Sequence, residues 1–395
     1  MTVLEELTVE EKEVVGELKR RMKNQMTPKM LEDESLFYRF CKARDFKIED
    51  AEIMLRKHIS WRKEFQVEKL LTDYKAPEAA EKYVPCNFTC FDKEGYLIRY
   101  IDLGNTDIKG LFSSVKKTNI LKYCFLILAR DEEKLKQNNK KTGKLLSKST
   151  YIMNFKNWTF AKSTHREFLE CVVQFAIIFQ DNYPERINRV LFINASTYFT
   201  LAFSVVKTVL SSALLQKISI YGTDSWQKDL LAMTDADLLP AFLGGTKTDP
   251  DGNPLCASFV VQGQKIPKSY YLCNSEKKLS KAPDAERLTV TRMSKEERCF
   301  EVEEPGSYLE WEFETKTKDI GFVIYFKGQS ESLPVELIPK QRIDTCYEPE
   351  KGLFRCEKPG KYVVVFDNSY SWMYPKEIYY RARIISPKDN ETFYN

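Results

Sequence analysis

The segment 244–254, with the sequence GGTKTDPDGNP, constrains the fold of this chain more than any other feature. It is dense in glycine, proline, aspartate and asparagine, which favour turns and interrupt regular elements. Before this segment, strand-like runs alternate with helical segments, and after it the helical period largely disappears. We therefore expect an α/β part followed by an all-β part.

The first part combines amphipathic helices with short apolar runs of strand length. Residues 8–70 are expected to be helical, and 48–65 show the clearest helical spacing of apolar side chains. Strands alternating with helices predict a mixed, mostly parallel sheet. The expected elements are strand 96–102 after a turn at 92–95, helix 114–136, a polar loop 137–148, strand 149–155, helix 163–182, strand 189–194, helix 199–212 and strand 217–222.

The part after residue 254 predicts an all-β module of about the size of a β-sandwich domain. Its strand-like runs are separated by turns such as 304–306 and 358–360. Together these features predict four regions, a helical subdomain over 1–76, an α/β domain over 77–246, a connecting segment over 247–275 and a β-sandwich over 276–395. The strands expected in the sandwich are 309–314, 321–326, 361–367 and 378–385.

Charge and composition exclude several classes of protein. The 61 Lys and Arg against 57 Asp and Glu give a net charge of only +4, so we expect no nucleic-acid partner. No run approaches the roughly 18–20 apolar residues that cross a bilayer, and the acidic N-terminus does not resemble a signal peptide. The ten cysteines form no CxxC pair. We expect reduced, buried thiols in a cytoplasmic protein that is peripheral at membranes.

The sequence offers no recognisable catalytic or metal-binding arrangement. The two histidines, His58 and His165, are too far apart for a closely spaced ligand pair, and there is no GxSxG elbow. The lysine loop 141–144 lacks the glycine and hydroxyl residues of a phosphate-binding loop. His58 lies on the apolar stripe of its helix and is expected in the core. We therefore expect a protein that is not an enzyme and has no cofactor and no metal.

One helical segment, 199–210, is unusually apolar. Ala202, Val205 and Val206 form a stripe that neighbouring apolar residues widen, leaving a narrow polar strip. Two readings remain open, a buried crossover helix and a helix that covers an apolar cavity and swings onto a membrane surface.

Three stretches of the first part resemble the CRAL-TRIO lipid-transfer family. They are LFYRFCKARDFKIEDAEIMLRKHISWRKEF at 36–65, NYPERINRVLFIN at 182–194 and LPAFLGGTKTDPDGNP at 239–254. The later stretches GSYLEWEF, DIGFVIYF and PGKYVVVFDNSY, at 306–313, 319–326 and 359–370, resemble a GOLD domain. The pairing is similar to the subgroup of supernatant protein factor, or tocopherol-associated protein.

The resemblance implies a pocket for one lipid, closed by a gate helix. The cargo would be a phosphoinositide, another phospholipid, squalene, a tocopherol or a retinoid. The implied pocket and gate residues are Ser149, Tyr151, Phe199, Leu201, Phe203, Val206 and Leu210.

The resemblance also implies a charged headgroup site. It would consist of Arg44, Glu185, Arg186 and Lys217, with Glu185 holding Lys217 in position. An ordinary network of ion pairs that braces the sheet is the alternative. Asp45 replaces a basic residue of the family, and Asn154 and Asn157 replace its aspartate and glycine.

The β-sandwich contains no expected chemistry and is interpreted as an interaction module. Trp372, Met373 and Tyr374 would dock on a partner or membrane, or pack within a loop. The expected partners are a lipid, a transient membrane surface and, through the GOLD domain, a trafficking protein. A rival hypothesis is a trafficking adaptor or scaffold that acts through the GOLD domain and has a vestigial pocket.

Overall fold

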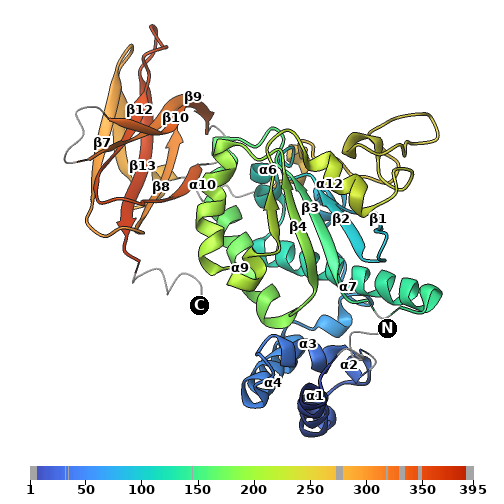
Figure 1. Cartoon of the computed structure of the whole chain (residues 1–395). Helices are drawn as coiled ribbons and strands as arrows, with labels where there is room; N and C mark the ends of the chain where they lie inside the picture. Colours follow the sequence, from blue (N-terminus) through green and yellow to red (C-terminus); the bar gives the residue numbers. More distant parts are fainter. Residues whose placement is uncertain are drawn as a thin grey trace. The chain divides into compact units, whose positions relative to one another are not determined.

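The computed structural model describes residues 7–387 except 32, 34, 145, 273–278, 317–318, 329–333 and 346–348. The chain forms two compact units (Figure 1). The α/β unit comprises Met1–Trp158, Phe175–Ser196 and Val209–Tyr271, and the sandwich unit comprises Thr159–Gln174, Thr197–Thr208 and Leu272–Asn395. Among the described residues, no helix is long and apolar enough to span a membrane.

The α/β unit begins with a cluster of helices, as the sequence predicts. The first helix is capped by Thr8, whose side chain accepts a hydrogen bond from the backbone of Glu11 while the Glu11 side chain accepts one in return. Apolar side chains such as Leu18, Phe40 and Leu55 form the shared core. The helices are α1 Val9–Met22, α2 Pro28–Leu31, α3 Leu36–Lys42 and α4 Ile48–Glu64.

A five-stranded mixed sheet forms the centre of this unit. Its order is β1-β2-β3-β4-β5, with β1 antiparallel to β2 and the other neighbours parallel. The predicted mixed, mostly parallel sheet is confirmed, although β1 and the short helix α6 were not predicted. The strands are β1 Cys86–Phe91, β2 Leu97–Ile101, β3 Ser149–Asn154, β4 Ile187–Ile193 and β5 Ile218–Ile220.

Helices cover both faces of the sheet. Ile98 and Ile152 pack with Trp226 of α12 on one face, while Arg99 forms a buried ion pair with Asp131 of α7 on the other. The predicted polar loop 137–148 is wrong over its first half, because α7 continues through these solvated turns to Gly143, which caps it with φ +67°. The helices are α5 Glu78–Tyr83, α6 Ile108–Ser114, α7 Lys117–Thr142, α9 Arg166–Asn182, α11 Ser212–Leu215 and α12 Trp226–Met233.

Residues 247–271, predicted as part of a connecting segment, are packed against the α/β unit. The Asn87 side chain donates to the Val261 carbonyl and accepts from the Val261 amide, both at 2.9 Å. The Gly263 amide donates to Asp102 at 3.0 Å and the Ile266 amide to Asp107 at 3.2 Å. These bonds satisfy buried backbone groups, so this stretch is part of the unit.

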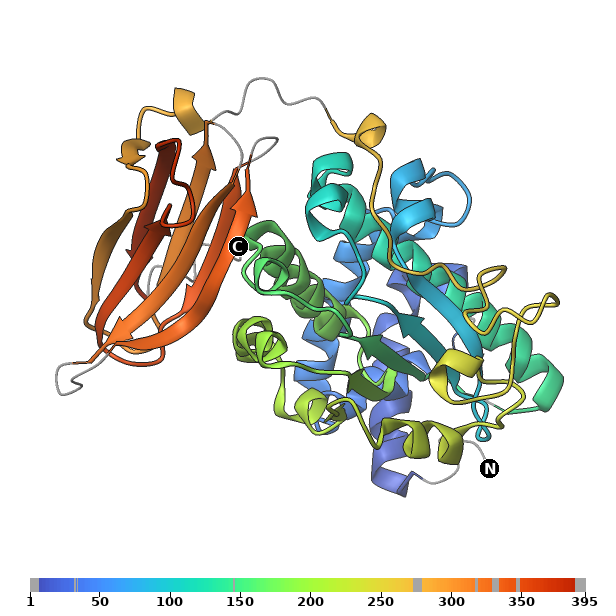
Figure 2. The same ribbon diagram turned by 90° about the horizontal axis from the view of Figure 1, so that it is seen from above.

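The sandwich unit contains two four-stranded antiparallel sheets (Figure 2). Their orders are β10-β9-β12-β7 and β11-β8-β13-β6, and inward-facing aromatics such as Phe313, Phe322 and Phe366 fill the space between them. The predicted all-β region is confirmed, and its strands are antiparallel. The strands are β6 Glu286–Val290, β7 Lys295–Val302, β8 Tyr308–Thr315, β9 Asp319–Lys327, β10 Val335–Asp344, β11 Glu350–Arg355, β12 Gly360–Asp367 and β13 Lys376–Ile385.

Two short segments from the first half of the chain complete this unit. Phe160, in α8 Phe160–Ser163, is buried in the sandwich core and stacks on Phe322 with ring centroids 6.4 Å apart. The Leu353 amide donates to the Thr164 carbonyl at 3.1 Å, and Arg166 at the start of α9 forms an ion pair with Glu310. Helix α10, Thr197–Val206, belongs to the same unit.

Candidate functional site

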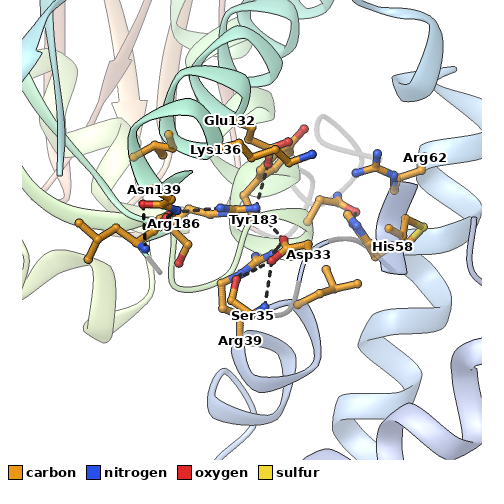
Figure 3. Close-up of a pocket in the computed structure, with 16 residues that line it drawn as sticks. Asp33, Ser35, Arg39, His58, Arg62, Glu132, Lys136, Asn139, Tyr183 and Arg186 are labelled. Carbon is orange, nitrogen blue, oxygen red and sulfur yellow. Dashed lines mark hydrogen bonds and ion pairs between the residues drawn. The ribbon is translucent and has the colours of Figure 1, made fainter. Parts of the chain in front are cut away.

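A buried network of charges joins the N-terminal helices to the rest of the α/β unit (Figure 3). Arg186 contacts Asp33 at 2.9 Å and Glu132 at 3.0 Å, and Arg39 contacts the same Asp33 oxygen at 2.5 Å. Burial alone would raise the pKa of Asp33, but the charges of Arg39 and Arg186 outweigh it and lower that pKa. Two arginines thus balance two carboxylates.

This network lines a cavity that is too small for a lipid. The cavity has a volume of about 110 Å³, whereas pockets for drug-sized ligands span roughly 300–1,000 Å³. Its walls include Arg39, His58, Tyr183 and Arg186 (Figure 3). We therefore assign the network a structural role. Arg186, predicted as part of the headgroup site, contacts Asp33 and Glu132, whereas Lys217 contacts Glu185.

His58 is a core residue, as predicted. It is 2% exposed, and its Nδ1 lies 3.0 Å from Oδ1 of Asn182. Burial, helped by the nearby charge of Arg62, lowers the pKa of His58 to about 3. The imidazole is therefore neutral at physiological pH.

A second group of charges lies where three parallel strands begin. Lys148 immediately precedes β3, Glu185 lies just before β4, and Lys217 immediately precedes β5. Since β3, β4 and β5 are adjacent and parallel, their amino ends meet at one edge of the sheet. The Lys217 ammonium lies 3.4 Å from Glu185, which agrees with the predicted pairing.

Three lysines surround this single glutamate. Lys148 is half-buried, and burial lowers its pKa, opposed by Glu185 and assisted by the positive charges of Lys217 and Lys42. Lys42, the last residue of α3, donates to the Tyr38 hydroxyl at 3.0 Å and also interacts with Glu185. We call Lys42, Lys148 and Lys217 the lysine cluster. Its net positive charge suits an anion such as a phosphate.

Arg44 lies apart from the described contacts of the lysine cluster. Its side chain is exposed and donates to the carbonyl of Ala43 at 2.9 Å. Asp45 is also exposed, with a φ of +49°. The sequence interpretation therefore paired Lys217 with Glu185 and missed Lys42 and Lys148. The position of Lys148 directly before a strand, like that of Lys217, is the signal that would have identified it.

The substituted asparagines keep the turn after β3 intact. Asn157 adopts φ +66°, a left-handed conformation that glycine and asparagine tolerate. Asn154 donates to the Tyr100 hydroxyl at 2.9 Å and accepts from Asn194 at 2.8 Å. The replacement of the family's aspartate and glycine is therefore compatible with an ordered turn.

Ser149 and Tyr151 lie on the sheet face opposite Ile152. Both are buried, and strand alternation and pairing place Met153, Val190 and Phe192 on their face. Burial raises the pKa of Tyr151, so its hydroxyl remains protonated. The face thus combines apolar side chains with two hydroxyl groups and the buried ion pair of Arg99, the register partner of Tyr151, with Asp131.

Helix α10 carries apolar residues on two sides. Tyr198 and Leu201 pack against the sandwich core, and the side chain of Thr208, just beyond the helix, interacts with Tyr308. Leu201 was predicted as a pocket or gate residue, and in the structure it is partly buried against the sandwich core. At 100° per residue, Phe199, Phe203 and Val206 lie almost opposite, and Leu210 follows the 3-10 turn Lys207–Val209 beyond the end of α10. The ring of Phe203 stacks on that of Phe199, with centroids 5.4 Å apart.

The described residues contain no group of His, Cys, Asp and Glu side chains that could hold a metal ion. Apart from the exposed Arg44 and Asp45, the charged side chains discussed above occur in ion pairs or in the lysine cluster. The arrangement is suited to binding an anionic, largely apolar molecule.

Comparison with known proteins identifies the first part of the chain. Residues 12–57 match the family model of the CRAL/TRIO N-terminal domain, and residues 81–245 match that of the CRAL/TRIO domain. The chain therefore contains a CRAL/TRIO domain preceded by its N-terminal domain. Neither family model reaches the sandwich strands β6 to β13.

The chain is also similar to individual proteins. Protein ctg-1 of Caenorhabditis elegans is 26% identical over 352 residues, which cover 88% of this chain and 90% of the relative. Protein real-time of Aedes aegypti is 27% identical over 307 residues, covering 74% of this chain but only 45% of that relative. The crystal structure of Sfh5 matches with a TM-score of 0.49 and 16% identity, covering 67% of this chain and 95% of Sfh5. The CRAL/TRIO match supports a lipid-binding or lipid-transfer protein, a class whose members are generally not enzymes.

Proposed function

We propose that this protein, through its CRAL/TRIO domain, holds one lipid molecule in a gated pocket and exchanges or presents it at membranes. The observation that carries the proposal is the match of residues 81–245 to the CRAL/TRIO domain. The protein is proposed to act in the cytoplasm and to meet membranes peripherally.

The lysine cluster is proposed to bind the headgroup of a phosphate-bearing lipid. The three ammonium groups interact with two carboxylates, Glu185 and, at Lys42, Glu11, so the site keeps an excess of positive charge. A phosphate placed there would relieve the repulsion that Lys148 experiences from Lys42 and Lys217. An inositol phospholipid or another acidic phospholipid therefore fits better than a neutral isoprenoid.

The apolar stripe of α10 is proposed as the gate over the lipid tails. Enclosing apolar surface stabilises a bound lipid by roughly 25 cal/mol per Å² removed from water. A carrier of this type keeps its lipid until a membrane offers an equivalent apolar phase. Exchange requires no bond to be made or broken, in keeping with a carrier.

We further propose that the sandwich is a GOLD domain that begins near residue 276. Its two antiparallel sheets and the stretches at 306–313 and 319–326 support this assignment. Such a module would connect the carrier to a trafficking partner.

Transfer of a fluorescent phospholipid between vesicles tests the gate. Phe203→Asp and Val206→Asp each place a charge on the proposed gate stripe and should abolish transfer, while circular dichroism shows a folded protein. Thr200→Asp is the matched control, because Thr200 is exposed on the same helix and should tolerate the charge. Normal transfer by folded Phe203→Asp and Val206→Asp proteins would refute the gate.

A further inference from the structure

Four large apolar side chains are exposed at one end of the sandwich. Trp372 is 75% exposed, Met293 68%, Tyr374 64% and Met373 58%. They come from two loops, 291–294 between β6 and β7 and 368–375 between β12 and β13. We call these four residues the apolar tip. The exposure of Trp372, Met373 and Tyr374 decides against the reading in which they pack within the loop.

Hydrogen bonds join the two loops and hold the apolar tip in place. The Met293 amide donates to the Ser371 carbonyl at 3.0 Å, and the Asn368 amide donates to the Ser294 carbonyl at 2.8 Å. The fully buried side-chain amide of Asn368 donates to the carbonyls of Thr291 and Tyr374, both at 3.0 Å. The loops are therefore built as one unit around Asn368.

The backbone conformation of Met293 is a second unusual feature of the apolar tip. Its φ of +56° lies in the left-handed region, which costs free energy for a residue with a β-carbon. The side chain is exposed, so its burial does not offset this conformational free energy. Strain of this kind at an exposed apolar residue points to a function outside the folded core.

Charges around the apolar tip are complementary to an anionic surface. Neither loop contains an acidic residue, and Arg292 is exposed with no ion pair among the residues that the structure describes. The acidic residues that flank the two loops in sequence are in ion pairs. Asp367 pairs with Lys340 at 2.8 Å and Glu377 with Arg287 at 2.7 Å, while Glu296 pairs with Arg298 at 3.6 Å and Glu297 with Lys295 at 2.9 Å. The loops therefore present one free positive charge beside four apolar side chains.

We propose that the apolar tip inserts into the interfacial layer of a membrane rich in anionic lipid. Tryptophan and tyrosine favour this layer, because their rings are apolar at one end and form hydrogen bonds at the other. The flexible methionines adapt to irregular apolar surroundings. Arg292 lies where it can meet a phosphate or carboxylate of a headgroup. This contact belongs to the sandwich and is independent of the proposed lipid pocket.

Sedimentation of the full chain with vesicles tests the proposal. The wild-type protein should bind vesicles of phosphatidylcholine with about one third phosphatidylserine more tightly than pure phosphatidylcholine vesicles. Replacing Trp372, Met373 and Tyr374 together by serine should weaken binding at least about tenfold, because the inserted apolar area is lost. Val335→Ser is the matched control, since Val335 is also an exposed apolar residue of the sandwich unit.

Two further variants separate insertion from simple charge attraction. Arg292→Glu should weaken binding to the phosphatidylserine vesicles only. Brominated lipid should quench the tryptophan fluorescence of the wild type, and Trp372→Phe should lose most of this quenching. Unchanged vesicle binding by the folded triple variant would overturn the proposal. Absence of binding by the wild type would also overturn it and would favour a protein as the occupant.

Discussion

Lys148 shows at the scale of one residue why an anion is the proposed ligand. Its ammonium is half-buried close to Lys42 and Lys217, with only Glu185 to compensate. A lysine that served only to brace the sheet would be expected to have a carboxylate for each ammonium, as in the network of Arg39, Arg186, Asp33 and Glu132. The two clusters therefore differ in charge balance.

Removal of lysines from the cluster should weaken the binding of acidic lipids selectively. Lys148→Ala and Lys217→Ala should each reduce affinity for a phosphoinositide by about tenfold, the loss expected for one charge-assisted hydrogen bond. Affinity for phosphatidylcholine should change much less. Lys63→Ala, at an exposed position on α4, is the control. Equal losses for both lipids would argue that the lysines support the fold.

Protonation of His58 should make stability depend on pH. Its pKa is lowered from 6.5 to about 3 by burial in the folded state. The unfolded chain therefore binds the proton first, and stability present above pH 6.5 is lost as pH falls toward 3. Between pH 7 and pH 5 the loss from this group should be about 2 kcal/mol.

Urea unfolding at the two pH values measures this effect. In His58→Gln, which keeps an amide near Asn182, the loss of stability between pH 7 and pH 5 should be smaller than in the wild type by about 2 kcal/mol. An unchanged pH dependence in this variant would show that His58 is not the group responsible.

At the scale of elements, helix α10 has apolar side chains on two sides. Tyr198 and Leu201 contribute to the sandwich unit, whereas Phe199, Phe203 and Val206 form the opposite stripe. Phe160, in the preceding helix α8, packs in the same core. A gate built in this way would be coupled to the sandwich.

Phe160→Ala should therefore destabilise the sandwich unit. The side chain is 1% exposed and stacked on Phe322, and such deletions typically cost about 3–5 kcal/mol. Chemical denaturation measures the loss in free energy of unfolding. The protease sensitivity of residues 286–385 shows whether the loss affects the sandwich unit. A cost below about 1 kcal/mol would mean that α8 contributes little to the sandwich core.

The sequence predicted the elements whose patterns are strong and local. The apolar runs of β3 and β4 and the helical spacing of α4 were found within a few residues. The end of α7 was missed, since solvated residues such as Gln137 and Asn138 look the same in a helix and in a loop. The packing of Leu201 on the sandwich and the position of Lys42 beside Glu185 depend on contacts between distant segments, which periodicity does not reveal.

At the scale of the whole molecule, the two units contribute different properties to one proposed carrier. The α/β unit contains the CRAL/TRIO sheet and the lysine cluster, and the sandwich unit contains the proposed gate helix and the apolar tip. The division at Tyr271 follows packing, because residues 247–271 belong to the first unit. An adaptor with a vestigial pocket would share this architecture and would differ from the carrier in retaining no lipid.

Identification of a bound lipid tests the central claim most directly. The protein would be incubated with a total membrane extract, repurified, denatured and extracted, and the released lipids quantified by mass spectrometry. The account predicts close to one lipid per chain, dominated by an acidic phospholipid that Lys148→Ala retains less well. A protein that retains no lipid from several extracts would contradict the carrier and favour the adaptor.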